Sequence, residues 1–416
     1  MKLKRNMFLK DDPLKKYSNP EVIPMNECLS ILNTGLRGID VASSKICDVR
    51  GKEGKLIYRG FPIQDLAEKA GFEEISFLLL YERLPNKKEL FDFSESLKQK
   101  RSLPENIFTI LKALPKDMNS MDVLQTATPL LIQNDKTADE PSMENTLYSA
   151  ENLIAGMASI TAAWDRIRNN KEVIPPHNDL SHAANFLYML TGEIPDPEIA
   201  QFFDTSLVLH AEHSFNASTF TARQVASTRA HIYAAVSAAI GSLSGALHGG
   251  ANVRVMQMLK EIGSMDKIDA YINSVLNSGE LIMGLGHAVY ETDDPRALIL
   301  GPMSRRMGEI SGQPLWYELS RELEKKAKAA FMARKQREIY CNVDFYSASL
   351  FYTMGIAMDL FSPVFAVSRI SGWSAHVIEE QFAMAAPKPS LYRPGATYVG
   401  SYCGPDECVF IDLDKR

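Results

Sequence analysis

The sequence of 416 residues lacks any run of about 18 apolar residues, the length that commonly spans a bilayer as a helix. We therefore predict neither a transmembrane helix nor a membrane partner. The first twenty residues carry basic side chains but no apolar segment of the kind found in secretory signals. Asp11 and Asp12 are also unlike a transit peptide, which is poor in acids.

Cysteine is scarce, and basic residues are not in excess. The five cysteines are an odd number without a zinc-binding spacing, which favours reduced thiols and a cytoplasmic location. The formal net charge of -6 argues against a nucleic-acid partner, which requires a basic face. Hydrophobic residues make up 45% of the chain, enough for a sizeable core.

Several motifs of catalysis and nucleotide binding are missing. No G-x-x-x-x-G-K-[ST] loop occurs, and alternation at period two is too rare for a βαβ nucleotide-binding sheet. The segment "GSLSG" has Leu243 at its centre where a nucleophile elbow requires serine. His210 and His213 have a spacing that could bind a metal on a helix, but H-E-x-x-H and a third ligand are missing. We predict no metal site.

Helical periodicity is the main pattern that is present. Apolar residues recur at three- and four-residue steps in segments 63–85, 141–170, 196–228, 231–247, 314–340 and 345–358. Segment 54–60, "GKLIYRG", is typical of a short strand, and 408–413, "CVFIDL", could be another. The fold class predicted is mainly α with minor β near the N-terminus.

Four short stretches concentrate titratable residues beside glycine or other small residues, and two arginines lie further along the chain. They are "LHAEHSFNAST" with His210 and His213, "GALHGGAN" with His248, "GLGHAVYETDDPR" with His287 and Arg296, "YCNVDFYSAS" with Asp344, and then Arg369 and Arg393.

Each of these residues has an ordinary structural explanation. A lone histidine is usually a core or surface residue, a lone arginine is usually a surface charge, and an aspartate before an apolar helix is usually its N-cap. The coincidence favours function. His248 and His287 lie in glycine-containing turns, where the backbone can approach a ligand closely. Asp344 has apolar and aromatic neighbours, so burial would raise its pKa and make it a better base.

These residue types suit one kind of chemistry. A carboxylate can remove a proton next to a carbonyl group while two imidazoles stabilise the charge on oxygen. Arginines suit a substrate with several carboxylates, because the guanidinium group pairs with them bidentately.

The same stretches resemble the citrate synthase family, in the family's order. The match begins with "GLRG" and "GKEGKLIYRGFPIQDLA", continues through "MDVLQT", "LHAEHSFNASTFTAR", "LHGGAN", "IMGLGHAVY" and "NVDFYSAS", and ends with "FAVSRISGWSAH" and "YRPGATYVG". It runs from about residue 35 to the end of the chain. The seven ordered motifs that follow the opening match are far more specific than one.

The resemblance implies a multihelical homodimer with two domains per subunit. Residues 35–248 and 350–416 would form a large domain, and 249–349 a small domain that closes over the substrates. Residues 1–34 would be an N-terminal arm. Closure excludes water, which matters for a reactive enol.

The resemblance also implies roles for individual residues. Asp344 would remove a proton from the methyl group of acetyl-CoA, and His248 would hydrogen-bond the thioester oxygen. His287 would polarise the keto oxygen of oxaloacetate while the carbon–carbon bond forms, and the thioester would then be hydrolysed. The enzyme would be an acyltransferase of the citrate (Si)-synthase type that serves the tricarboxylic acid cycle.

Further residues would bind the substrates. His213, Arg296 and Arg369 match groups that hold oxaloacetate, and Arg393 matches an arginine that reaches into the other subunit's site. No tightly bound cofactor is implied, because acyl-CoA is a substrate. The residues implied to contact it are Met283, Gly284, Leu285, Gly286 and Ala288 around the adenine end, and Phe365 beside the acyl group.

One residue departs from the family pattern. Glu291 replaces a basic residue that would meet a CoA phosphate, and an acid is electrostatically unsuited to that task. Arg305 and Arg306 are candidates to compensate for it.

Two other functions stay open. 2-Methylcitrate synthase, which uses propionyl-CoA, is the nearer alternative, because the segment around His213 and the closing "LDKR" resemble it. A non-catalytic CoA- or dicarboxylate-binding relative is the other, but such a protein would not need Asp344 as a base. The motifs around Asp344 and Arg369 favour citrate synthase.

Overall fold

A computed structural model describes residues 35–36, 38–287, 289–400 and 408–415. Its described residues fall into two compact units. One contains the described parts of 1–41 together with 393–400 and 408–415; the other is Ala42–Tyr392, which contains the helical body and the sheet. The predicted arm, 1–34, lies outside the described residues.

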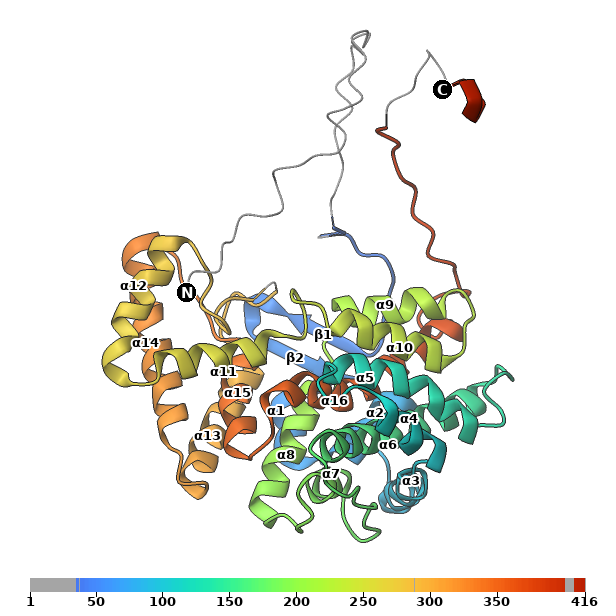
Figure 1. Ribbon diagram of the computed structural model, residues 1–416, viewed down its shortest axis with the longest axis horizontal. Helices are drawn as coiled ribbons and strands as arrows, with labels where there is room; N and C mark the ends of the chain where they lie inside the picture. Colours follow the sequence, from blue (N-terminus) through green and yellow to red (C-terminus); the bar gives the residue numbers. More distant parts are fainter. Residues whose placement is uncertain (1–34, 37, 288, 401–407, 416) are drawn as a thin grey trace. The chain divides into compact units, whose positions relative to one another are not determined.

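The larger unit is mainly helical (Figure 1), as the periodicity predicts. Its α-helices in chain order are α1 (Ile63–Lys69), α2 (Phe72–Tyr81), α3 (Lys87–Lys100), α4 (Glu105–Ala113), α5 (Ser120–Ala127), α6 (Met143–Arg168), α7 (His182–Thr191), α8 (Pro197–His210), α9 (Ala217–Ala226), α10 (Ile232–Leu243), α11 (Ala251–Ile262), α12 (Ile268–Ser278), α13 (Pro295–Ile310), α14 (Leu315–Lys335), α15 (Val343–Thr353) and α16 (Phe361–Gln381). Short 3-10 helices are η2 (Gly51–Glu53), η3 (Thr128–Asn134), η4 (Met265–Lys267), η5 (Met358–Leu360) and, in the smaller unit, η6 (Leu413–Lys415). None of the described helices is long and apolar enough to cross a membrane.

The β structure is one small antiparallel sheet of order β1-β2-β3. Strand β1 (Cys47–Arg50) pairs with β2 (Lys55–Tyr58), which pairs with β3 (Phe61–Pro62). The expected strand at 54–60 is therefore confirmed. The expected strand at 408–413 is wrong, because 408–412 are irregular and η6 follows.

Helix α16 is the centre of the larger unit, and every residue from Phe361 to Glu380 is buried. Helices from earlier in the chain surround it, with α11 to α15 gathered on one side in Figure 1. Its small residues permit close approach. A Cβ at Gly372 would overlap Glu212 and the carbonyl of Ala211, so this glycine lets the turn after α8 lie directly on α16.

Two long periodic segments are each divided into two helices. Segment 63–85 breaks at Gly71 between α1 and α2, and segment 196–228 breaks at 211–216 between α8 and α9. At each new start a polar side chain accepts a hydrogen bond from an N–H of the first turn. The Asp204 carboxylate accepts from the N–H of Phe72, and Asn216 accepts from that of Thr219. His213 lies in the second break, outside both helices.

The described cysteines are not all reduced. Cys47 and Cys341 are free thiols, but Cys408 is disulfide-bonded. The expectation of reduced thiols is therefore wrong for Cys408, since an odd cysteine count still allows one pair.

Candidate active site

The turn between α8 and α9 carries His213 and is fixed by the β-sheet. The Tyr58 hydroxyl donates to the carbonyl of Glu212 at 2.8 Å and accepts from its N–H at 3.2 Å. The Nε2 atom of His213 lies 3.3 Å from the Tyr290 hydroxyl. Burial, followed by the charge of Arg296, lowers the pKa of His213 well below its ordinary value. His213 is therefore a neutral imidazole near pH 7.

His287 has a defined tautomer. Its Nδ1 accepts from the backbone N–H of Val289 at 2.9 Å and of Tyr290 at 3.1 Å. Because Nδ1 is an acceptor, the proton of the neutral ring must be on Nε2. Burial and the charge of Arg296 lower the pKa of His287 to about 4. The residue is thus a neutral donor through Nε2.

An antiparallel bridge joins the His287 loop to the segment before Asp344. Leu285 pairs with Cys341, the Gly286 N–H donates to the Tyr340 carbonyl at 2.7 Å, and the Asn342 N–H donates to the Gly284 carbonyl at 3.0 Å. Gly284 has φ +78°, and a Cβ there would lie 2.7 Å from Phe345. Two motifs that are more than fifty residues apart in sequence are thereby brought together.

Asp344 lies in the first turn of α15 without capping it. Asn342 is the N-cap, since its side chain accepts from the Asp344 N–H at 3.0 Å. The N-cap explanation of Asp344 is therefore wrong. Among the described residues, no group donates a hydrogen bond to its carboxylate. Burial raises the pKa of Asp344 to about 6, and Arg296 opposes the shift.

His248 faces the N-terminus of α9. Its Nε2 accepts from the N–H of Ser218 at 3.2 Å and lies 2.8 Å from the Ser218 hydroxyl. The neutral ring therefore carries its proton on Nδ1, which has no hydrogen-bond partner in the described chain. Burial and then Arg369 lower the pKa of His248 to about 4. His248 is thus a neutral donor through Nδ1 at a helix N-terminus.

Arg296 is held by a buried ion pair. Its Nε and Nη2 donate to the two carboxylate oxygens of Asp294 at 3.0 and 2.7 Å, and both side chains are at most 3% exposed. Burial alone would lower the pKa of Arg296, but Asp294 raises it above its ordinary value. Nη1 makes no hydrogen bond within the described residues, which leaves one edge of the guanidinium for another partner.

Arg369 is also buried, but nearby acids compensate its charge less than Asp294 compensates that of Arg296. Its Nε donates to the His210 carbonyl at 2.7 Å, and its guanidinium lies 4.7 Å from the centre of the Phe365 ring. Neither Nη atom has a hydrogen-bond partner in the described chain. Burial lowers the pKa of Arg369 to about 10, with Glu212 opposing. A buried guanidinium with four free N–H bonds is suited to an anionic ligand.

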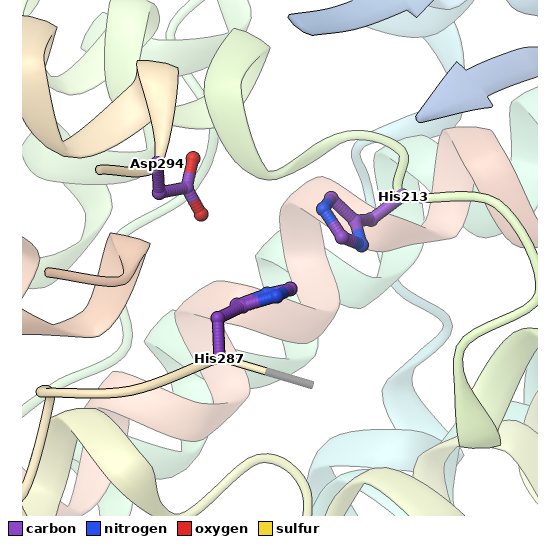
Figure 2. A group of neighbouring side chains, drawn as sticks. All are labelled: His213, His287 and Asp294. Atoms are coloured by element: carbon purple, nitrogen blue, oxygen red, sulfur yellow. The ribbon is translucent and has the colours of Figure 1, made fainter. Parts of the chain in front are cut away.

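Figure 2 shows His213, His287 and Asp294, which approach one another from three separate segments. The two imidazole rings are 5.4 Å apart, and the three donor atoms are close enough together to surround a cation. Two of the three are already engaged, however. Both Asp294 oxygens accept from Arg296, and Nδ1 of His287 accepts two N–H groups, which leaves a proton on Nε2. The chemistry of this group favours hydrogen-bonding a ligand oxygen over binding a metal.

The remaining residues predicted to bind the substrates are described mainly by their exposure. Gly284 and Leu285 are buried, Met283 is half-buried and Gly286 is exposed, whereas Ala288 lies outside the described residues. Phe365 is buried with its ring 5.0 Å from that of His210. Arg393 is exposed and belongs to the smaller unit.

The two arginines suggested to offset Glu291 are already paired. Arg305 bonds Glu309 at 3.2 Å, and Arg306 bonds Glu198 at 2.9 Å. The structure therefore gives no support to either arginine as a substitute for the basic residue that Glu291 replaces.

Sequence reasoning missed four residues that shape the site. Asp294 was recoverable, because Asp-Pro at the start of a helix is a capping signal. No sequence signal indicated Tyr290, Ser218 or Tyr58, since their contacts join segments that are distant in sequence.

Comparison with known proteins identifies the family. The family model described as "Citrate synthase, C-terminal domain" matches residues 35–395. The chain belongs to the citrate synthase family. It is accordingly an acyltransferase that forms a carbon–carbon bond, as the resemblance of its motifs implied.

Named relatives include citrate synthases and 2-methylcitrate synthases. The chain is 42% identical to a citrate synthase of Haloferax volcanii over 390 residues, which cover 92% of this chain and 99% of that one. It is 36% identical to a 2-methylcitrate synthase of Shewanella oneidensis over 379 residues, with 90% and 97% covered.

Solved structures of the family have the same fold. Citrate synthase from Thermotoga maritima is similar with a TM-score of 0.80 at 35% identity, covering 93% of this chain and 99% of that one. Citrate synthase from Thermoplasma acidophilum, solved as a ternary complex with carboxymethyl coenzyme A and oxaloacetate, has a TM-score of 0.83 at 27% identity, with 93% and 100% covered. The predicted fold class is confirmed.

Proposed function

We propose that the protein is a citrate synthase that condenses acetyl-CoA with oxaloacetate. The observation that carries the proposal is Asp344, a half-buried carboxylate that accepts no hydrogen bond from the described residues and whose pKa is raised to about 6. Such a carboxylate is available to a substrate, and its raised pKa suits it to accept a proton from a weak carbon acid.

Oxaloacetate would occupy the cationic side of the site. The free Nη1 of Arg296 and the two free Nη atoms of Arg369 would bind its carboxylates. His287 would donate from Nε2 to the keto oxygen, and His213 would contact the same end of the substrate. The bound anion would offset the charge of Arg369, which the protein itself compensates incompletely.

Acetyl-CoA would react beside it. Asp344 removes a proton from the methyl carbon, and Nδ1 of His248 donates to the thioester oxygen that becomes the enol oxygen. The enol carbon then attacks the keto carbon while Nε2–H of His287 hydrogen-bonds the keto oxygen, and the proton that Asp344 removed completes the new hydroxyl group. Water hydrolyses the resulting citryl-CoA to citrate and CoA. The neutral imidazoles can donate without placing a second full charge beside the arginines.

We also propose a domain arrangement and an oligomeric state. Residues 249–349 would form a small domain that closes on the large one, and Met283 to Ala288 with Phe365 would contact the acyl-CoA. The active unit would be a homodimer in which Arg393 of one subunit contacts oxaloacetate bound to the other.

The choice of acyl-CoA is tested by comparing kcat/KM for acetyl-CoA and propionyl-CoA with oxaloacetate. Reactions without oxaloacetate control for simple thioester hydrolysis. We expect acetyl-CoA to be preferred by about tenfold or more, the range that one methylene group gives in a packed pocket. A preference for propionyl-CoA would instead make the protein a 2-methylcitrate synthase, the specificity of the relative from Shewanella oneidensis.

A further inference from the structure

The β1–β2 hairpin touches the two loops that carry His213 and His287. At its open end, Tyr58 hydrogen-bonds the backbone of Glu212, next to His213. At its closed end, the carbonyl of Gly51 accepts from the N–H of Glu291 at 3.1 Å, four residues after His287. The strands pair from Cys47 with Tyr58 to Arg50 with Lys55, so the two ends are joined by a continuous ladder.

The closed end is packed so tightly that it admits only glycine. A Cβ on Gly51 would overlap the carbonyl oxygen of Val289 and lie 2.8 Å from its carbonyl carbon. The obstructing atoms are backbone, so no side-chain rotation can relieve the overlap. The φ angle of Gly51 lies outside the left-handed region, and an alanine there would be resisted by this contact rather than by its own conformation.

The obstructed peptide is one that holds the catalytic imidazole. The carbonyl of Val289 and the N–H of Tyr290 belong to the same planar peptide group. One side of that group rests on Gly51, and the other side donates to Nδ1 of His287 at 3.1 Å. A shift of the Val289 carbonyl must therefore move the N–H that fixes the tautomer of His287.

We infer that Gly51 is a positioning residue for catalysis, because its bare Cα lets the hairpin turn seat the 289–291 backbone and so keeps the proton of His287 on Nε2. The hairpin would act as a brace between the loops of His213 and His287, whose imidazole ring centres are 5.4 Å apart. The inference rests on the role proposed for His287.

Gly51→Ala tests the inference, with Lys52→Ala as the control in the same turn, where the side chain is exposed. Turnover, KM for each substrate and thermal unfolding are measured for both variants. The tautomer of His287 is followed by NMR of protein labelled with ¹³C in its histidines, and His287→Gln assigns the signal. We expect kcat of Gly51→Ala to fall about 10²-fold, as small displacements of catalytic groups do. KM would change less, the Nε2–H signature of His287 would be lost, and Lys52→Ala would match wild type.

A second pair of variants removes the contact from the other side and covers the case in which Gly51→Ala does not fold. Glu291→Pro deletes the N–H that donates to Gly51, whereas Glu291→Ala keeps it. The inference requires that the proline variant alone loses turnover and the His287 signature.

Three results would each overturn the inference. In the first, Gly51→Ala keeps wild-type turnover. In the second, its turnover falls while the His287 signal is unchanged. In the third, both Glu291 variants behave alike. The proposed function fails separately if His287→Gln turns over normally, since the tautomer signal in Gly51→Ala does not depend on that outcome.

Discussion

Asp344 combines two properties that a structural aspartate rarely has. It lies in the first turn of α15, where the helix N-terminus favours a negative charge, yet its carboxylate accepts no hydrogen bond from the described residues. Burial outweighs the nearby arginines and raises its pKa to about 6. The apolar neighbours of Asp344 in the sequence predicted this direction. The identity of the N-cap, Asn342, was not predicted because either residue could occupy that position.

The pH dependence of turnover follows from Asp344. Its pKa in the folded protein lies above the ordinary 3.8, so the carboxylate that acts as base is present above about pH 6 and is lost as pH falls through it. His248 and His287, with pKa values of about 4, stay neutral over the same range. We expect kcat/KM for acetyl-CoA, measured between pH 4.5 and 8.5, to have a single acid limb with a midpoint of about 6, because this ratio reports the pKa values of the free enzyme. A limb near the ordinary pKa of aspartate, or none, would be inconsistent with a base whose pKa is raised by its surroundings.

At the scale of elements, the site depends on where helices begin and end. Periodicity located the helical segments well, because an amphipathic repeat is a local property. It predicted a single helix over 196–228, whereas α8 ends at His210 and α9 begins at Ala217. The break combines a local signal, the capping of α9 by Asn216, with a tertiary contact, the bonds from Tyr58 to Glu212. No local pattern carries the second contribution.

The start of α13 gives a prediction at this scale. Asp294 caps the helix and pairs with Arg296, and both side chains are buried. Asp294→Asn keeps a capping oxygen but removes the charge, which leaves Arg296 buried without a counter-ion. We expect the free energy of unfolding, from chemical denaturation, to fall by about 3–5 kcal/mol and KM for oxaloacetate to rise.

The control for that variant is Asp269→Asn, which breaks the exposed pair with Lys326. Exposed pairs contribute about 0–1 kcal/mol, so this change should be nearly silent. Equal effects of the two substitutions would mean that the Asp294 pair is not a special feature of the site.

For the whole molecule, ordered motifs were more informative than spacing. The family assignment came from seven motifs in sequence, and the structure brings His213, His287, Arg296, Arg369 and Asp344 within electrostatic reach of one another. The brace formed by the β1–β2 hairpin could not be predicted, because it joins Gly51 to Glu291 across 240 positions through backbone atoms. Sequence patterns report on side chains, whereas this contact is made by backbone atoms alone.

The central claim is that Asp344 removes the methyl proton of acetyl-CoA, and Asp344→Ala tests it most directly. Citrate formation from acetyl-CoA and oxaloacetate would be measured together with washout of deuterium from [²H₃]acetyl-CoA in water, and oxaloacetate binding would be measured by calorimetry. We predict that condensation and washout both fall by about 10²–10⁴-fold, the contribution of a general base, while the Kd for oxaloacetate stays near that of wild type. Undiminished turnover in Asp344→Ala would contradict the account.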